Sequence, residues 1–370
     1  MTTMTTTKRW RTILACLMAA VLGAYCTSEV PVTEDTAAVA DAVPPGTLRS
    51  GPAFEFNQIT EDVYHATGTG TLSVGSNSVI IINEEDVMLV DSHITPAAAY
   101  VLGEELRAIT DKPIRYVVDT HFHFDHAHGN QIFGPDVEII GHDFTYEMLS
   151  DPEAILNSRT YVGFTGGVPA QVEDLRNQIE TAEDPEQIAE LEAQLQVQES
   201  YMAALGAVRP TPPTLTFSSE MTIFAGEREI QLIAVGRGHT GGDVVVYLPD
   251  EGIVATGDFF LPGVPYMGDA YLDEWPDALE KLREIEFEMI LPGHGPAFTD
   301  RGRIDDLQAL LRDLWTKLTD LRAEGVSAED AAEQVDLTNH QANYPNFTSP
   351  GIDARAVLRA YERMDEIASE

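Results

Sequence analysis

Cysteine is almost missing from this 370-residue sequence. Its two cysteines, Cys16 and Cys26, both lie close to the N-terminus. From residue 27 onward the chain therefore has no thiolate that could bind a metal or act as a nucleophile, and no pair that could form a disulfide. Chemistry in the main part of the chain must rely on other side chains.

Basic residues are scarce as well. Lys and Arg together number 22, against 61 Asp and Glu, so the formal net charge is −39. Phosphate backbones and anionic lipid surfaces are bound by clustered Lys and Arg, which this composition does not favour. We therefore expect a small-molecule substrate and no nucleic acid as a partner. The oligomeric state stays open.

The sequence also has no apolar run near its N-terminus that is long enough to span a bilayer. The uncharged, mostly apolar run over residues 13–25 is shorter than the roughly 20 residues that a spanning helix needs. It follows the bases Lys8, Arg9 and Arg11, as the apolar part of a secretory signal does. We predict that residues 1–26 are a signal peptide and that the protein is exported, to the periplasm or out of the cell.

The end of this leader allows two interpretations. Cleavage after Ala24 would release the chain, whereas a lipoprotein leader would attach it to a membrane through lipid on Cys26. Lipoprotein signals usually carry Gly or Ala before the cysteine, and this chain has Tyr25 there. We prefer cleavage without lipidation, and a lipid anchor at Cys26 is the alternative.

The remaining composition is that of a folded protein. Hydrophobic residues make up 44% and charged residues 22%, which is typical of globular domains. Residues 27–52 are rich in Ala, Val, Thr, Pro and acids, so we predict a flexible linker there. We expect a main domain over residues 53–300, with a helical insertion at about 165–210, and a helical C-terminal segment over residues 301–370.

Two groups of short β-type runs indicate an α/β fold. A helix over residues 95–109 interrupts the first group, with Thr95 as its N-cap and Pro96 in its first turn. A helix over residues 276–285 lies within the second group. Two sheet-forming halves, each with helices, predict a sandwich of two β-sheets covered by helices. The expected strands are 63–66, 78–82, 87–90, 114–118, 215–217, 221–224, 230–235, 244–248, 253–255 and 289–291.

The segment between the two halves has the opposite character. It is rich in Glu, Gln, Ala and Leu, its apolar residues recur at helical spacing, and Asp184-Pro185 interrupts the pattern. We predict two antiparallel helices joined by a short turn. Segments between ligand motifs often border a binding cleft, so we expect this hairpin to contact the substrate.

Metal-ligand side chains are concentrated in one hexapeptide, His121-Phe-His123-Phe-Asp125-His126, which directly follows a predicted strand. Two histidines two residues apart can bind one metal ion, and Asp125 and His126 on the turn beyond can face a second. Imidazole and carboxylate ligands suit Zn²⁺. The hexapeptide therefore predicts a metal site.

Four further ligand-type residues follow other predicted strands. They are Asp91, His239, Asp258 and His294. The carboxyl ends of strands in layered α/β folds meet at one edge of the sheet. We therefore expect these side chains to join the hexapeptide in one metal centre.

In combination, these motifs resemble the metallo-β-lactamase-fold hydrolase superfamily over roughly residues 54–300. The resemblance implies a four-layer αβ/βα sandwich with two metal ions in a cleft at one edge. It implies that the first ion is held by His121, His123 and His239. The second would be held by Asp125, His126 and His294, with Asp258 as the bridge and Asp91 as a buried residue that orients a ligand.

The resemblance also implies the chemistry. Two Zn²⁺ ions per chain, with iron or manganese as alternatives, would make a shared water acidic enough to attack as hydroxide near neutral pH. Asp125 and Asp258 would be the catalytic carboxylates, and Asp125 would orient the water or accept its proton. No side-chain nucleophile is required, in agreement with the missing cysteines.

The bridging position narrows the reaction. Some lactamases of the superfamily have Cys or Ser at this position. With Asp258 there, this chain resembles the thioesterase, lactonase, arylsulfatase and nuclease branches. Lactonases commonly have Tyr three residues later, where this chain has Leu261, although Tyr266 could reach the site. We expect cleavage of an ester, thioester, lactone or lactam-type bond. The alternatives are β-lactamase activity and an iron-dependent persulfide dioxygenase of the same fold.

The remaining histidines have no spacing that predicts a ligand. We expect ordinary structural roles for His65, His142 and His340, and a place on a helix surface for His128. For His93, the cleft and an exposed turn are equally open.

Overall fold

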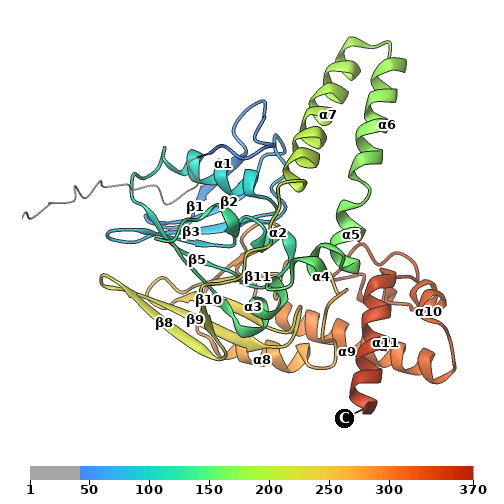
Figure 1. Cartoon of the computed structure of the whole chain (residues 1–370). Coiled ribbons are helices and arrows are strands. Elements are labelled where there is room, and N and C mark those ends of the chain that lie inside the picture. The colour runs from blue at the N-terminus through green and yellow to red at the C-terminus, as the bar shows by residue number, and fades with distance from the viewer. Residues whose placement is uncertain (1–41, 370) are drawn as a thin grey trace, which may run out of the picture. The chain divides into compact units, whose positions relative to one another are not determined.

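Two stacked β-sheets form the centre of the protein in a computed structural model that describes residues 42–369 (Figure 1). The predicted signal peptide over residues 1–26 and most of the predicted linker lie outside the described residues. Among residues 42–369, no helix is both long and apolar enough to cross a membrane.

The first sheet has seven strands that follow one another in chain order. Strands β1 to β4 are antiparallel neighbours, whereas β4 to β7 are parallel. Helix α1 (Pro96–Leu106) connects β4 to β5, as the βαβ pattern predicts. The strands are β1 (Phe54–Gln58), β2 (Val63–Gly68), β3 (Ser78–Ile82), β4 (Val87–Val90), β5 (Ile114–Val118), β6 (Glu138–His142) and β7 (Leu215–Phe217).

The second sheet has five strands in the order β12-β11-β10-β9-β8. Strands β11 and β12 are parallel, and the other neighbours are antiparallel. The sequence missed β1 and β6 and placed the other strands within two residues of their observed ends. The strands are β8 (Glu220–Ala225), β9 (Arg228–Gly236), β10 (Asp243–Leu248), β11 (Ile253–Gly257) and β12 (Met289–Pro292).

Strand β3 shows how the core is divided between the faces of the first sheet. Every residue of this strand is buried, and successive side chains point to opposite faces. Val79 and Ile81 pack against the second sheet, whereas Ile80 and Ile82 pack in the cluster that contains the apolar side of α1. A strand buried on both faces reads as a continuous apolar run, which is why β3 was recognisable in the sequence.

Helices cover the outer face of the second sheet. Helices α8 (Trp275–Glu284), α9 (Arg303–Ala323), α10 (Ala328–Gln334) and α11 (Ala354–Ser369) share one buried cluster with side chains of β9 to β12. The predicted four-layer αβ/βα sandwich and helical C-terminal segment are therefore confirmed. The remaining short helices are α2 (Phe124–Ala127), η1 (Asn130–Ile132), α3 (Asp143–Leu149), α4 (Pro152–Leu156), α5 (Arg159–Thr165) and η2 (Thr338–His340).

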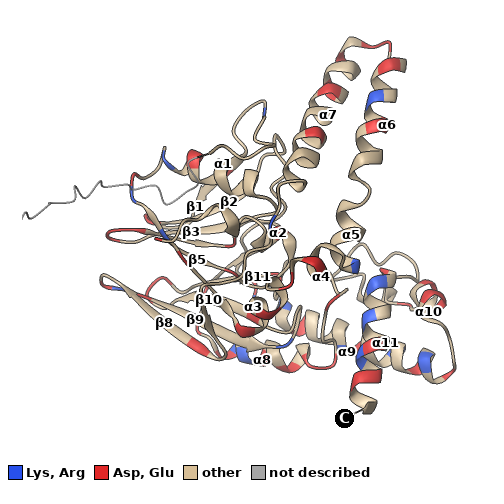
Figure 2. Cartoon of the chain, viewed as in Figure 1, with Lys and Arg blue, Asp and Glu red and all other residues tan. Residues whose placement is uncertain are grey.

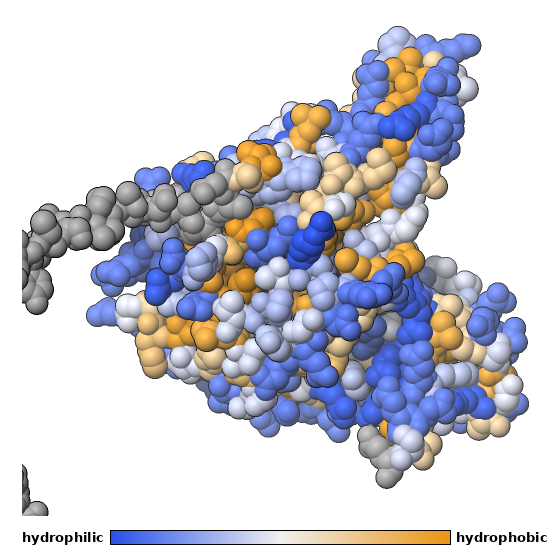
Figure 3. Space-filling view, viewed as in Figure 1, coloured by the Kyte–Doolittle hydropathy of each residue, from blue (hydrophilic) through white to orange (hydrophobic). Residues whose placement is uncertain are grey.

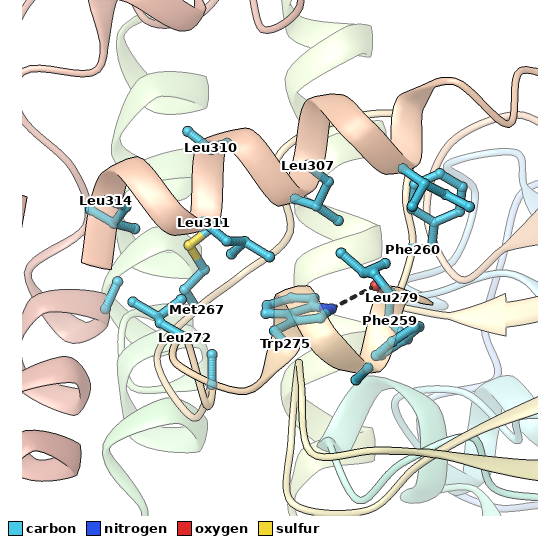
Figure 4. Close-up of a cluster of buried hydrophobic side chains, with 14 of the residues drawn as sticks. Phe259, Phe260, Met267, Leu272, Trp275, Leu279, Leu307, Leu310, Leu311 and Leu314 are labelled. Carbon is cyan, nitrogen blue, oxygen red and sulfur yellow. Dashed lines mark hydrogen bonds between the residues drawn. The ribbon is translucent and has the colours of Figure 1, made fainter. Parts of the chain in front are cut away.

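The cluster beneath the second sheet also anchors the loop that follows β11 (Figure 4). Phe259 and Phe260, directly after Asp258, are fully buried against Trp275 and leucines of α9. The indole nitrogen of Trp275 donates a hydrogen bond to the carbonyl oxygen of Phe259 at 3.1 Å. This packing fixes the backbone on which Asp258 sits.

The predicted helical insertion is a hairpin of α6 (Val168–Thr181) and α7 (Pro185–Leu205) that extends away from the sheets (Figure 1). Asp184 caps α7, because its carboxylate accepts a hydrogen bond from the backbone nitrogen of Glu186. Apolar side chains gather along the seam between the two helices, and hydrophilic ones surround them (Figure 3). Leu191 in this seam is buried, so the hairpin is held together by its own apolar face.

The last residues of the predicted linker are held against the domain, so the prediction of a flexible segment through residue 52 is wrong at this end. Arg49 pairs with Glu105 of α1 at 3.0 Å, and the hydroxyl of Ser200 donates to the carbonyl oxygen of Leu48 at 2.9 Å. The composition of the segment gave no sign of these contacts, because they come from two helices, α1 and α7, that lie far away in the chain.

Acidic residues are distributed over the described fold, whereas basic residues are conspicuous on α11, where all of them are arginines (Figure 2). These arginines are neutralised locally. Arg363 pairs with Asp273 at 3.1 Å, and Arg355 and Arg359 pair with Asp353 and Glu366, both at 2.6 Å.

Candidate metal centre

The seven predicted ligands and Asp91 meet at one edge of the sandwich. The hexapeptide follows β5, Asp91 follows β4 and His239 follows β9, while Asp258 and His294 follow β11 and β12. The potential ligand atoms fall into groups in which all atoms lie within 4.8 Å of one another. The fold thus brings together residues that are separated by more than a hundred positions in the chain.

The first group consists of His121, His123 and His239, and all three are buried. Nδ1 of His123 lies 3.1 Å from Nε2 of His121 and 2.9 Å from Nε2 of His239. Three ring nitrogens that face one another in this way are spaced as ligands of one metal ion.

The second group consists of Asp125, His126 and His294. Nε2 of His294 lies 3.1 Å from Oδ2 of Asp125, and Nε2 of His126 lies 3.6 Å from the same oxygen. This mixture of imidazole and carboxylate is again a donor set for a divalent transition metal.

Asp258 lies between the two groups. Its Oδ1 is 3.4 Å from Nε2 of His126, and its Oδ2 is 3.3 Å from Nε2 of His294 and 3.8 Å from Nε2 of His239. One carboxylate therefore reaches both groups, which is the position that a bridging ligand requires.

Two buried atoms at this point lack a hydrogen-bond partner within the protein. They are Nε2 of His126 and Oδ1 of Asp258. Buried polar atoms are normally paired, and unpaired ones need an explanation such as an ion. A cation between the two groups would satisfy both atoms, so the residues present fit a metal centre.

The protonation of the histidines agrees with this. Burial lowers the pKa of His121 well below its usual range and that of His239 to about 3, so both rings are neutral and offer a lone pair. Burial acts the same way on His126 and His294, but the nearby carboxylates of Asp258 and Asp125 outweigh it. They raise the pKa of His126 strongly and that of His294 to about 10. A metal ion would supply this positive charge in place of the protons.

The turn at Pro292-Gly-His-Gly295 needs a glycine to bring His294 in. A Cβ on Gly293 would lie 2.5 Å from Oδ1 of Asp258 and 2.7 Å from Cε1 of His126. Only a residue without a side chain allows the backbone to pass this close to the ligands.

Asp91 holds His126 in place from behind. Its Oδ2 accepts hydrogen bonds from Nδ1 of His126 at 2.8 Å and from the hydroxyl of Thr120 at 2.9 Å, and its Oδ1 accepts from the backbone nitrogen of Thr120 at 2.8 Å. Its backbone has a φ of 66°, a left-handed conformation that non-glycine residues rarely adopt. Asp91 leaves Nε2 of His126 free to face the metal position.

We expect Asp91→Asn to weaken metal binding by roughly 10–100-fold, because an amide cannot accept all three hydrogen bonds. Competition with a chromophoric chelator would measure this affinity. Asp313→Asn is the control, since Asp313 also accepts bonds from three side chains, Lys317, Asn339 and His340, away from the centre. Equal affinities of the two variants would contradict the role given to Asp91.

Sequence reasoning missed Asp269. One of its oxygens accepts a hydrogen bond from Nε2 of His123 at 3.0 Å and from the hydroxyl of Thr160 at 2.5 Å. Burial alone would raise the pKa of Asp269, but these two bonds lower it to about 2, so it is a carboxylate. Asp269 lies in a long loop after β11, and no motif in that loop marks it as a partner of the hexapeptide.

His128 is not on a helix surface, so that prediction is wrong. Its side chain is buried, with its ring 5.5 Å from that of Tyr161, which α5 contributes. His93 is also buried, with its Nε2 2.9 Å from the hydroxyl of Ser78. It therefore lies neither in an exposed turn nor in the wall of an open cleft. The residues that cover these two histidines, such as Tyr161 and Ser78, lie in other parts of the chain. The sequence around each histidine therefore could not predict its burial.

Two cavities adjoin the centre and share Gly75 and His294. One has a volume of about 410 Å³ and is mainly apolar, with Ile94, Leu261 and Val264 in its wall. Phe164 of α5 and Tyr201 of α7 also line it. The other cavity has a volume of about 700 Å³ and extends over β1 and β2.

Comparison with known proteins identifies the family. A model of the metallo-beta-lactamase superfamily matches residues 73–294, so the chain belongs to this superfamily. It is 25% identical to the linear primary-alkylsulfatase of Pseudomonas sp. (strain ATCC 19151) over 285 residues, which cover 71% of this chain and 50% of the alkylsulfatase. It is 24% identical to the probable metallo-hydrolase YqjP of Bacillus subtilis (strain 168) over 278 residues, which cover 68% of this chain and 81% of that protein.

A solved structure shows the same fold. The inverting sec-alkylsulfatase Pisa1 from Pseudomonas sp. matches with a TM-score of 0.57 at 15% identity, over 84% of this chain and 50% of the alkylsulfatase. The chain thus spans half the length of both alkylsulfatases that it matches.

Proposed function

We propose that this protein is an exported, zinc-dependent hydrolase that cleaves an ester, thioester, lactone or lactam-type bond in a small substrate. The observation that carries the proposal is the pair of ligand groups joined by Asp258 beside an apolar cavity. Family membership and the named metallo-hydrolase relative support it.

Each residue of the centre has a task in this reaction. When bound, two Zn²⁺ ions supply a Lewis acid and a water acidic enough to ionise near neutral pH. His121, His123 and His239 would hold one ion, and Asp125, His126 and His294 would hold the other. Asp258 would join the two sites, and Asp125 would orient the attacking water or accept its proton. A side-chain nucleophile has no part in this scheme.

The apolar cavity indicates what the substrate carries next to its scissile bond. Phe124, Leu261 and Val264 line it together with Phe164 and Tyr266. Such a wall favours an alkyl, acyl or aromatic group, because burying apolar surface contributes about 25 cal/mol per Å². No lysine or arginine lines this cavity, whose wall lies entirely within the described part of the chain.

A sulfate ester with an alkyl chain is the second candidate substrate. It is favoured by the similarity to the Pseudomonas alkylsulfatase, and the same apolar cavity would take the chain. The match covers only half of that alkylsulfatase, so sulfate ester cleavage by this chain is a proposal.

The decisive experiment combines metal analysis with a substrate panel. Purified protein would be analysed for zinc, iron and manganese, then assayed with β-lactam, lactone, thioester, carboxylic ester and alkyl sulfate substrates, with and without a chelator. We expect two zinc ions per chain and chelator-sensitive hydrolysis of one preferred class. One iron with oxygen uptake would instead support a persulfide dioxygenase, and preferred β-lactam turnover would support a lactamase.

Export is the remaining part of the proposal. It is supported by the basic residues near the N-terminus and by the apolar run over residues 13–25 that follows them. N-terminal sequencing and mass spectrometry of protein recovered from a secreting host would test it. A mature chain starting at Tyr25 is expected, whereas a lipid-modified Cys26 would establish the lipoprotein alternative and an intact leader would contradict both.

We expect Phe164→Ala to raise KM about fivefold for esters of long acids, because losing roughly 40 Å² of apolar contact costs about 1 kcal/mol. The KM for an acetate ester should change little, since a short acyl group would not reach this wall. Val162→Ala is the control, because Val162 is an exposed residue of the same helix outside the cavity wall. Equal changes for short and long esters would contradict a role of α5 in substrate binding.

A further inference from the structure

The cavity of about 700 Å³ on the other side of His294 differs from the apolar one in chemistry. It runs over β1 and β2, and Glu55, Asn57, Thr67 and Asn77 contribute polar side chains to its wall. Because both cavities reach His294, a substrate bound with its scissile bond at the metal centre would extend one part into each.

The side-chain amides in this wall have their nitrogens occupied by the protein. Nδ2 of Asn77 donates to the carbonyl oxygens of Pro292 at 3.1 Å and Gly295 at 2.9 Å. Nδ2 of Asn57 donates to the carbonyl oxygen of His65 at 3.2 Å and to Oγ1 of Thr67 at 3.1 Å. Carbonyl oxygens cannot donate, so the orientation of both amides is determined. The amides of Asn57 and Asn77 therefore offer the groove only their oxygens, which accept hydrogen bonds, whereas the hydroxyl of Thr67 accepts from Asn57 and keeps its own proton to donate.

The charge of the groove wall also favours a ligand group that donates hydrogen bonds. Glu55 on β1 is exposed and adds a carboxylate, which only accepts hydrogen bonds. The hydroxyl of Ser76 donates to the backbone oxygen of Asp125 at 2.6 Å. All residues of this wall belong to the described chain, and none of them is a lysine or arginine. The net charge of −39 strengthens the negative field.

We propose that this groove is a second substrate subsite, which binds a hydrogen-bond-donating polar group, either uncharged or cationic. The inference rests on the proposed hydrolase function and adds the nature of the substrate's second part. The substrate class is then an ester-type compound with an apolar group on one side of the scissile bond and a hydroxyl- or ammonium-bearing group on the other. An anionic group on that side is disfavoured.

Equilibrium binding would test the groove separately from catalysis. Isothermal titration of the zinc-loaded protein would use three hexyl ethers, which cannot be hydrolysed as esters, with 2,3-dihydroxypropyl, butyl or 3-sulfopropyl as the second group. We expect the dihydroxypropyl ether to bind roughly three- to tenfold more tightly than the butyl ether. The sulfopropyl ether should bind more weakly than the dihydroxypropyl ether.

Reversing the charge of Glu55 would show whether the groove causes the difference in affinity between the ethers. Glu55→Lys should shift the ratio of the two affinities toward the sulfopropyl ether by roughly five- to tenfold at low salt. Glu220→Lys is the matched control, since Glu220 is an exposed residue of the edge strand of the other sheet. It makes the same change in net charge, and the ratio should remain that of the unaltered protein.

Turnover of the three corresponding hexanoate esters separates the two proposals. If the affinity ratio shifts as expected but none of the three esters is hydrolysed, the subsite stands and ester hydrolysis fails as the reaction. If the esters are hydrolysed but the ethers bind equally well, or Glu55→Lys and Glu220→Lys give the same ratio, the subsite is overturned. Preference of the unaltered protein for the sulfopropyl ether would overturn it as well.

Discussion

Replacing His123 by alanine is expected to empty the first metal position and to lower kcat/KM by roughly a thousandfold or more. His123 is central to its group, because its Nδ1 faces both His121 and His239 at about 3 Å. Loss of a Lewis acid removes several kcal/mol of transition-state stabilisation, and about 4 kcal/mol corresponds to a factor of about a thousand. Elemental analysis after dialysis would measure the bound metal, and steady-state kinetics on the preferred substrate would measure the rate.

His340→Ala is the control for this variant. His340 is a histidine that pairs with Asp313 at 2.9 Å, on the C-terminal helices and outside the metal centre. We expect it to retain its metal and its activity. A His123→Ala protein that still bound two ions and turned over normally would refute the whole assignment of the centre.

The second large effect is expected for Asp269→Ala. This change leaves the outer nitrogen of His123 without an acceptor and removes the negative charge that keeps the ring oriented. We expect metal affinity to fall by roughly 10–100-fold and kcat/KM to fall with it at limiting metal. Much of the rate should return at saturating zinc, because Asp269 positions a ligand and takes no part in the reaction itself.

Two further variants make this test specific. Asp273→Ala alters the same loop, but Asp273 forms its hydrogen bonds with Arg363 and not with a ligand, so the metal affinity of this variant should stay unchanged. Thr160→Val removes the other hydrogen bond to Asp269 and should have a smaller effect than Asp269→Ala. If Asp273→Ala and Asp269→Ala weakened zinc binding equally, a general disturbance of the loop would explain the result.

Much of the fold could be predicted because its signals are local. Strands β3 and β4 are short apolar runs with polar residues at their ends, and α1 begins with an N-cap and a proline. Such patterns reflect the burial and the hydrogen bonding of neighbouring residues, which the chain carries wherever it folds. The helical hairpin was predictable for the same reason, since its apolar seam recurs at helical spacing.

The metal ligands could be predicted for a different reason than the helices and strands. Its residues are types that ordinarily bind metals, and they follow strands whose ends meet at one edge of the sheet. The residues around the ligands had no such marker. Asp269 is one acid among 61, and nothing local distinguishes it from Asp273 four residues later.

The sequence by itself determined the class of fold, the family and the residues that can bind metal, because each is encoded in residue type and short-range spacing. The tertiary structure alone decided which carboxylate orients His123, why His128 is buried and how two cavities of opposite character meet at His294. These features depend on contacts between segments far apart in the chain. Chain folding creates such contacts, and no local pattern records them.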